Sequence, residues 1–296
     1  MKNIFKGTGV ALITPFKNNG DVDFESLSKL LDHCINGGVD FLVVLGTTSE
    51  SPTLVDSERN AVVSHIVKVN DNRLPILMGL GGNDTRLICS NLNAIPNGID
   101  GFLCVSPYYN KPTQEGIYQH FKEISNSTNL PIVLYNVPGR TGSNMSASTT
   151  LSLANKFQNI VAIKEASGDL EQAMQIIKDA PDGFDVLSGD DNLTFSMILL
   201  GATGVISVSG QSFPRKFSRM VNHLLNGELS VAKYIHFQLF NYTKLIFQEG
   251  NPGGVKWALN YMGITSDKLR LPLWKISDEL KSLIAKEVDE IRENSN

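Results

Sequence analysis

The chain has 296 residues and a formal charge of −4, with 26 basic and 30 acidic residues interspersed along it. Its length exceeds that of an average domain, yet α/β barrels commonly reach this size as a single unit. The charges form no basic stripe for nucleic acid and no polybasic patch for a membrane. No apolar run approaches the roughly 20 residues of a membrane span. We therefore expect neither a nucleic-acid nor a membrane partner, and the composition favours chemistry on small molecules.

The three cysteines, Cys34, Cys89 and Cys104, are dispersed among apolar residues and lack the spacing of metal ligands. An odd number of cysteines in this pattern indicates reduced core residues. Residues 1–6 lack the apolar core of a signal peptide. The sequence therefore predicts a cytoplasmic protein without a cysteine-based metal site.

Eight short apolar runs recur along the first two thirds of the chain. The predicted strands are 9–14, 41–46, 75–80, 101–106, 131–135, 160–164, 185–188 and 204–208. Helical patterns lie between them, and Asp23, Asp56 and Asp169 each open one. A repeat of roughly 20 to 35 residues is typical of successive right-handed βα units. Since eight such units close a barrel, the sequence predicts a (β/α)8 TIM barrel.

An open, doubly wound sheet is the competing arrangement, but the first loop, 14–20, has no glycine-rich phosphate-binding pattern. After Val208 the strand pattern ends. The helices predicted beyond it are 217–225, 229–247, 253–262 and 277–293. Because a barrel needs only one helix after its eighth strand, we predict a barrel at residues 1–225 and a C-terminal helical region at residues 226–296.

Lys164 ends the apolar run of the sixth predicted strand. Burial at a strand end disfavours the ammonium form, so the amine can act as a nucleophile near neutral pH. The alternative is a side chain that extends from the strand end into solvent, as most lysines do. Barrel enzymes build their active sites at the C-terminal ends of the strands, which favours a functional role for Lys164.

Three other predicted strands end in polar residues that would open onto the same mouth. They are Thr47 and Thr48 after the second strand, Tyr108 and Tyr109 after the fourth, and Tyr135 and Arg140 at the end of the fifth. Taken singly, such residues are usually loop caps, packed aromatics and solvated charges. Together with a buried lysine they provide an amine nucleophile and hydroxyl groups that move protons, which is what imine chemistry requires.

Four motifs lie at these strand ends: Gly46-Thr-Thr-x-Glu, Pro107-Tyr-Tyr-Asn, Tyr135-Asn-Val-Pro-x-Arg-Thr-Gly and Ile163-Lys-Glu-Ala. In combination they closely resemble the dihydrodipicolinate synthases, which belong to the N-acetylneuraminate lyase superfamily of class I aldolases. The match runs in order from Gly7 to about Ser209. The chain departs from the common pattern at Ser49, where the family often has glycine, and at Gly139, where a small hydroxyl residue is frequent.

The resemblance implies that Lys164 forms a Schiff base with pyruvate and that Tyr135 passes protons and gates the site. Thr47 would link Tyr135 to Tyr109 in a proton relay. In the family the second tyrosine reaches in from the adjoining subunit, so the resemblance implies a homo-oligomer, a dimer or a tetramer, with Tyr109 crossing the interface. No metal or organic cofactor is expected, because the protonated imine is itself the electron sink.

The resemblance also implies how the substrates are held. Thr48 and the backbone at Ile206 would hold pyruvate, whose carboxylate meets the donors of Thr47 and Thr48. Arg140 would bind the carboxylate of L-aspartate 4-semialdehyde, for which a planar bidentate group suits the geometry. The expected product is 4-hydroxy-tetrahydrodipicolinate, an intermediate of diaminopimelate and lysine biosynthesis.

Two alternatives remain. The first is a sister activity on the same lysine, the cleavage of N-acetylneuraminate or of a keto-deoxy sugar acid. Arg140 argues against it, because sugar-acid enzymes of this superfamily generally lack that arginine. The second is a barrel that binds a small ligand without turning it over, and the joint presence of Lys164, Tyr135 and Thr47 weighs against it.

Many family members are inhibited by lysine at a cleft between paired subunits. The effector-facing positions implied here are Ser51, Pro52, Asp56, Arg59, Asn83 and Leu87, beside Tyr108. Leu87 replaces the acidic partner of the effector ammonium, and Asp56 replaces a histidine expected to meet the effector carboxylate. A buried charge without its partner carries a large desolvation cost. We therefore expect insensitivity, or poor sensitivity, to L-lysine.

Overall fold

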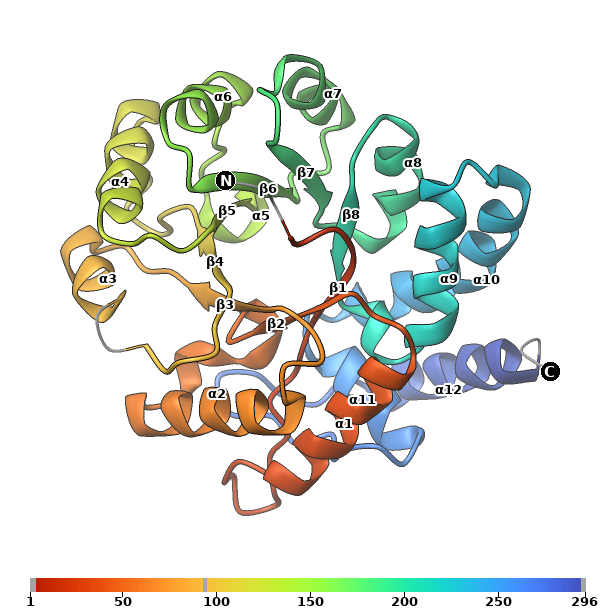
Figure 1. Cartoon of the computed structure of the whole chain (residues 1–296). Helices are drawn as coiled ribbons and strands as arrows, with labels where there is room; N and C mark the ends of the chain where they lie inside the picture. Colours follow the sequence, from red (N-terminus) through yellow and green to blue (C-terminus); the bar gives the residue numbers. More distant parts are fainter. Residues whose placement is uncertain (1–3, 93–94, 294–296) are drawn as a thin grey trace.

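The computed structural model describes residues 4–92 and 95–293. Eight parallel strands form a closed barrel in chain order, with β8 paired to β1 (Figure 1). The strands are β1 (Gly7–Ala11), β2 (Phe41–Val44), β3 (Ile76–Leu80), β4 (Gly101–Val105), β5 (Ile132–Asn136), β6 (Ile160–Glu165), β7 (Asp185–Ser188) and β8 (Gly204–Ser207). The predicted fold class is therefore confirmed.

The first strand lies at Gly7–Ala11, two to three residues earlier in the chain than the predicted range 9–14. β1 begins at Gly7, whose φ of +77° favours glycine, and Gly7 is the register partner of Gly204. A Cβ at Gly204 would lie 2.2 Å from the carbonyl oxygen of Gly7, so the barrel closes only with glycine at that position. Residues 12–14 resemble a strand in sequence, and the N–H of Leu12 still donates to the carbonyl of Val43 at 3.0 Å. The chain leaves the ladder at Ile13, whose N–H donates to the side chain of Gln211 at 3.0 Å.

Helices surround the barrel; α1 to α8 lie between successive strands and α9 follows β8 (Figure 1). Asp23 and Asp169 cap α1 and α7 by accepting backbone N–H groups, and α2 begins at the predicted Asp56. The helices of this layer are α1 (Phe24–Asn36), α2 (Asp56–Asn70), α3 (Thr85–Asn91), α4 (Gln114–Asn126), α5 (Pro138–Thr141), α6 (Ala147–Lys156), α7 (Leu170–Asp179), α8 (Thr194–Leu199) and α9 (Pro214–Leu225).

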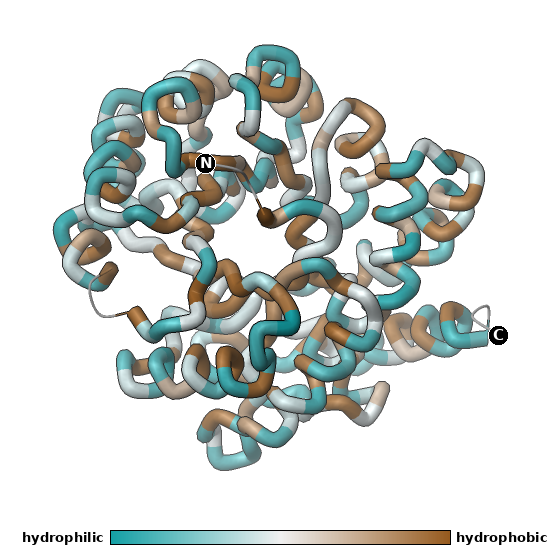
Figure 2. Tube along the Cα trace, in the orientation of Figure 1, coloured by the Kyte–Doolittle hydropathy of each residue, from teal (hydrophilic) through white to brown (hydrophobic). Residues whose placement is uncertain are grey.

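The core has two apolar layers. One lies between the strands and the helices. The other fills the barrel and consists of Phe5, Ala11, Phe41, Val43, Leu77, Leu103, Val133, Tyr135, Val137, Val161, Ala162, Leu187 and Ile206. Strands covered on both faces are mostly hydrophobic, and Figure 2 shows this along the barrel while the outer helices alternate in hydropathy. Because side chains alternate along a strand, polar residues at the strand ends are divided between the two layers.

The C-terminal region consists of α10 (Leu229–Gln248), α11 (Gly253–Tyr261) and α12 (Asp278–Glu293), and α10 packs against α9 and the other two. On α12, Leu280, Ile284, Val288 and Ile291 are buried, while Leu283 is 41% exposed. The predicted boundary between residues 225 and 226 falls between α9 and α10 and stays a proposal. Among the described residues, no helix is long and apolar enough to cross a membrane.

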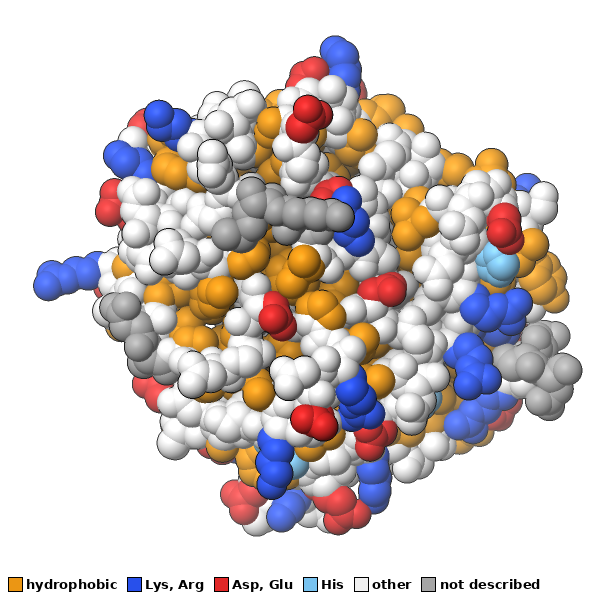
Figure 3. Space-filling view, viewed as in Figure 1, with side chains coloured by type: hydrophobic (Ala, Val, Ile, Leu, Met, Phe, Trp, Pro, Cys, Tyr) orange, Lys and Arg blue, Asp and Glu red, His pale blue; other side chains and the backbone are white. Residues whose placement is uncertain are grey.

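The surface is mixed in charge. Figure 3 shows acidic and basic side chains interspersed over most of one face, with several basic ones gathered near α9 and α12. Cys34 and Cys104 are buried, Cys89 is half-buried, and all three thiols are free. Burial raises the pKa of the Cys34 and Cys104 thiols, which disfavours thiolate chemistry at these positions.

Candidate active site

Neighbouring strands bring Lys164 and Tyr135 together inside the barrel. The two residues are register partners across β6 and β5. The Nζ atom of Lys164 lies 4.4 Å from the centre of the Tyr135 ring, and each residue is only 6% exposed. The lysine is therefore buried beside a phenol, and the alternative of a solvent-extended side chain is wrong.

The next residue on each of these strands faces outward and locks the register. Asn136 donates through Nδ2 to both carboxylate oxygens of Glu165, at 3.2 and 3.0 Å. Glu165 also accepts the Ser167 N–H at 2.7 Å and the Gln172 amide at 3.0 Å. This buried cluster holds the ends of β5 and β6 together, and sequence reasoning missed it. The available signal was a polar residue directly after Tyr135 and Lys164 in strands otherwise apolar.

Gly189, directly after β7, leaves the space that the lysine occupies. A Cβ at this position would lie 2.5 Å from the Cβ of Ala166 and 3.1 Å from the Cε of Lys164. Sequence reasoning did not select Gly189, although a glycine at the C-terminal end of a predicted barrel strand was visible. Its role is steric, since any larger side chain meets the lysine chain.

The loop after β2 carries Thr47 and Thr48 in a 3-10 turn (Thr47–Ser49). Thr48 is buried, with 2% exposure, and its Oγ1 accepts a hydrogen bond from Asn251 Nδ2 at 2.9 Å. Ser49, one of the departures from the family pattern, donates through its hydroxyl to the carbonyl of Gly46 at 2.7 Å. The serine hydroxyl is thus used inside the loop itself.

Glu50 closes the same loop with an ion pair to Lys256, and both side chains are fully buried. Burial lowers the pKa of Lys256 to about 8, although the neighbouring Glu50 carboxylate acts in the opposite direction. Lys256 also lies over the ring of Phe16, with its Nζ 4.2 Å from the ring centre. The C-terminal region therefore contacts the predicted substrate-binding loop directly, which sequence reasoning did not anticipate.

The remaining predicted residues lie at different depths. Ile206 is on β8 and belongs to the apolar cluster inside the barrel with Tyr135. Arg140 lies on α5, directly after β5, and is exposed. Tyr109 has a φ of +73° and is 87% exposed, while its N–H donates to the carbonyl of Thr141 at 3.4 Å. The structure thus brings the Tyr109 backbone beside the Arg140 helix and leaves the tyrosine ring in solvent.

Asp191 fixes the chain that follows Ile206. Its Oδ2 accepts the N–H groups of Val208 at 3.0 Å and Ser209 at 2.7 Å. Complete burial raises the pKa of this carboxyl, and the hydrogen bond from Ser209 opposes that effect. Asp191 therefore joins the loop after β7 to the end of β8.

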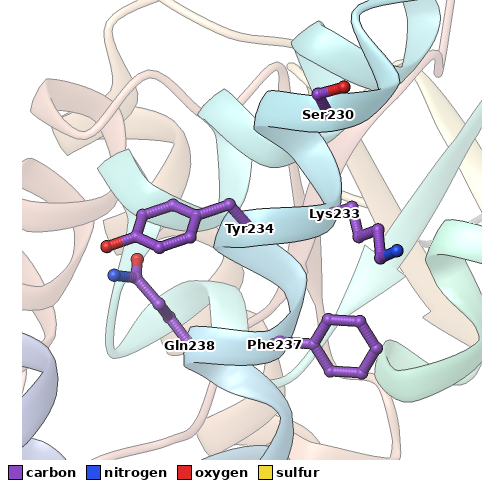
Figure 4. Close-up of a pocket in the computed structure, with 5 residues that line it drawn as sticks. All are labelled: Ser230, Lys233, Tyr234, Phe237 and Gln238. Carbon is purple, nitrogen blue, oxygen red and sulfur yellow. The ribbon is translucent and has the colours of Figure 1, made fainter.

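No cluster of three or more His, Cys, Asp or Glu side chains that could hold a metal ion occurs within residues 4–92 and 95–293. A surface groove runs along the outside of α10 and is lined by Ser230, Lys233, Tyr234, Phe237 and Gln238 (Figure 4). This groove lies outside the barrel, so it is not part of the site around Lys164.

Residues 4–291 match the model of the dihydrodipicolinate synthetase family. The chain belongs to this family. Among its relatives, the 4-hydroxy-tetrahydrodipicolinate synthase of Parabacteroides distasonis is 54% identical over 269 residues, which cover 90% of this chain and 91% of the relative. The enzyme of the same name from Bacillus subtilis is 42% identical over 288 residues, covering 97% and 99% of the two chains.

Solved structures of the family agree with the fold. The chain is similar to the dihydrodipicolinate synthase of Thermotoga maritima, with a TM-score of 0.96, 40% identity and coverage of 98% of this chain and 99% of the other. It is also similar to a monomeric dihydrodipicolinate synthase variant, with a TM-score of 0.95, 40% identity and coverage of 98% and 97%. The family expected from the four strand-end motifs is therefore confirmed.

Substituting Gly189→Ala should slow the expected reaction of Lys164 with pyruvate by at least about tenfold, because the added Cβ displaces the lysine chain by a fraction of an ångström or more. The rate of covalent trapping with borohydride measures this. Gly139→Ala is the matched control, since a Cβ there meets nothing within 4 Å. Equal trapping rates in the two variants would show that Gly189 does not shape the position of the amine.

Proposed function

We propose that the protein is a 4-hydroxy-tetrahydrodipicolinate synthase that condenses pyruvate with L-aspartate 4-semialdehyde. The observation that carries this proposal is the buried Lys164 amine beside the Tyr135 phenol, in a chain of this family. The name carried by the relatives supports the same activity. The pathway that follows is diaminopimelate and lysine biosynthesis.

In the proposed reaction, the neutral Lys164 amine attacks the ketone carbon of pyruvate, and the resulting carbinolamine loses water to give an imine. Loss of a methyl proton converts the imine to an enamine, whose methylene carbon attacks the aldehyde. The amine of the adduct then displaces Lys164 and closes the ring. The protonated imine accepts the electron pair, so the reaction uses no metal or organic cofactor.

In this proposal, hydroxyl groups carry out the proton transfers. Tyr135, whose ring faces the amine, passes protons to and from the carbinolamine oxygen. Thr47 links Tyr135 to Tyr109 in the proposed relay. The exposure of Tyr109 supports a role outside its own barrel, because an 87% exposed ring has little contact with the chain that carries it.

Substrate binding divides between buried and exposed residues. Thr48 and the backbone of Ile206 hold pyruvate; both residues are buried, and Ile206 belongs to the cluster inside the barrel. Arg140 binds the carboxylate of L-aspartate 4-semialdehyde at the exposed end of β5. The smaller substrate thus lies deeper than the larger one, which enters after the imine has formed.

We propose a homo-oligomer, a dimer or a tetramer, in which Tyr109 completes the site of a neighbouring subunit. The Tyr109 backbone is left-handed and donates to the carbonyl of Thr141, while the residue itself is 87% exposed, which supports this role. The three free cysteines support a cytoplasmic location. The chemistry requires pyruvate and the semialdehyde as small-molecule partners.

A sister activity on N-acetylneuraminate or a keto-deoxy sugar acid is the alternative. It would use the same lysine, so trapping of pyruvate alone does not separate the two. The two functions are separated by comparing condensation with L-aspartate 4-semialdehyde and aldol cleavage of sialic acid in the same preparation. We expect condensation only.

Incubation with pyruvate and borohydride should add a reduced pyruvyl group to Lys164, which peptide mapping by mass spectrometry locates. Lys164→Arg should abolish the adduct, because a guanidinium group stays protonated and does not attack a carbonyl. An adduct on a different lysine, or one that forms only with sugar acids, contradicts the assignment.

Mixing inactive Tyr109→Phe subunits with inactive Lys164→Ala subunits should restore part of the condensation rate, since a mixed interface contains one complete site. Subunit exchange is first verified with two differently tagged preparations. If exchange occurs and activity stays at the level of the two parents, Tyr109 does not act across a subunit boundary.

We propose that L-lysine inhibits this enzyme weakly or not at all. Leu87 is 57% exposed and offers no charge to an ammonium group. Asp56 pairs with Arg59 at 3.1 Å, and Arg59 donates to the carbonyl of Ser51 at 3.1 Å. The Asp56 carboxylate then lies where the carboxylate of the effector is expected, and the two negative charges repel each other. Asn83 remains beside Tyr108 through a 3.4 Å contact, so part of the polar lining is kept.

Initial condensation rates across a titration of L-lysine should therefore change little at sub-millimolar concentrations. Leu87→Glu restores an acidic side chain at the position where the resemblance places one, and it should increase sensitivity. Strong inhibition of the unaltered enzyme in the sub-millimolar range would show that this charge argument is wrong.

A further inference from the structure

The loop that carries Thr47 and Thr48 adopts a backbone that requires external support. Leu45 has a φ of +53° and Glu50 a φ of +57°, and neither is glycine. Side chains with a Cβ rarely adopt this left-handed region, so such residues persist only where the surroundings fix them. The contacts that fix this loop therefore determine where Thr48 lies.

Two of these contacts come from one segment of the C-terminal region, residues 251–256. Glu50 forms its ion pair with Lys256, and both side chains are completely buried. The second Glu50 oxygen accepts the backbone N–H of Arg270 at 3.0 Å, while Lys256 donates to the carbonyl of Lys268 at 2.8 Å. Paired and hydrogen-bonded charges of this kind fix the end of the loop in one position.

The other contact reaches Thr48 itself. Asn251 donates through Nδ2 to the Thr48 hydroxyl oxygen at 2.9 Å, although the two residues are 203 positions apart. Both are buried, at 9% and 2% exposure. Because the oxygen of Thr48 accepts this bond, its single hydroxyl hydrogen is directed to another acceptor. A carboxylate is an acceptor only, so Thr48 is presented as a donor for one.

We propose that Asn251 is a positioning residue that orients the Thr48 hydroxyl towards the carboxylate of pyruvate. The C-terminal helical region then takes part in substrate binding as well as covering the barrel. This inference rests on the proposed function, in which Thr48 binds pyruvate. Asn251 acts through Thr48 and does not itself touch the reacting atoms.

The test is a double-mutant cycle on pyruvate binding. Asn251→Ala should raise the KM for pyruvate by about tenfold, the effect of one hydrogen bond to a charged group, and leave kcat within about twofold. Thr48→Val should raise it by a similar factor. The double variant should be no worse than Thr48→Val alone, because Asn251 has nothing left to orient.

Asn251→Asp keeps the size of the side chain and reverses the hydrogen bond, since a carboxylate must accept the Thr48 proton. It also places a negative charge near the substrate carboxylate, so its KM for pyruvate should exceed that of Asn251→Ala. Asn260→Ala is the control. Asn260, on the helix α11 that begins two residues after Asn251, donates to the carbonyl of Thr265 at 3.0 Å, and its loss should not change the KM for pyruvate.

Borohydride trapping on the unaltered enzyme separates the two proposals. If the enzyme traps no pyruvate on Lys164, the proposed function fails, and this inference fails with it. If trapping is normal but Asn251→Ala has an unchanged KM, only the inference fails. Additive losses in the double variant, or an equal loss in Asn260→Ala, would likewise overturn it, because both outcomes indicate general destabilisation. The melting temperature of each variant, measured alongside, identifies any that does not fold. If Asn251→Ala does not fold, the KM of Asn251→Asp alone is compared with that of the unaltered enzyme, and an unchanged KM overturns the inference.

Discussion

The register between β5 and β6 is the constraint on which the rest of the site depends. It sets Tyr135 opposite Lys164, so the amine meets the phenol ring inside the barrel. The following pair, Asn136 and Glu165, faces outward and is joined by hydrogen bonds that water does not reach. A slip of one residue would exchange the two pairs and move the lysine to the outer layer. The polar cluster outside the barrel thus maintains the arrangement inside it.

Around this pair the site has a buried part and an exposed part. Lys164, Tyr135, Thr48 and Ile206 are buried and held by strands or by contacts to the C-terminal region. Tyr109 and Arg140 lie on exposed segments after β4 and β5. A preorganised interior suits covalent chemistry on a small keto acid, because the amine and its proton donors are already in place. Exposed residues suit the recognition of a second substrate that arrives later.

Much of this organisation could be predicted from the sequence, because it follows from local periodicity. Eight apolar runs with helical patterns between them specify a closed barrel, and the rule that barrel sites lie at strand ends selects Lys164 and Tyr135. The errors of prediction also have a physical cause. Residues 12–14 resemble a strand, but the chain leaves the ladder at Ile13, whose N–H bonds to Gln211, 198 positions away.

The contacts of Asn251 and Lys256 could not be predicted in the same way. Each joins the C-terminal region to the loop after β2, about 200 residues earlier in the chain, and no pattern within either segment indicates the partner. Gly189 differs, because a glycine after a strand was visible, yet its steric role depends on the path of the Lys164 side chain. Contacts set by packing between distant segments therefore account for what sequence reasoning missed.

The buried ion pair of Glu50 and Lys256 also restricts how this protein can be recombined with its relatives. A chimaera that joins this barrel to a C-terminal region without the matching lysine would leave a carboxylate buried without a counter-charge. Removing one partner of such a pair costs about 3 to 5 kcal/mol, a large share of the roughly 5 to 15 kcal/mol by which a typical protein is stable. With relatives that lack this pair, the barrel and its helical appendage are therefore exchangeable only as a unit, and crossover points that preserve folding lie outside the span from Glu50 to Lys256.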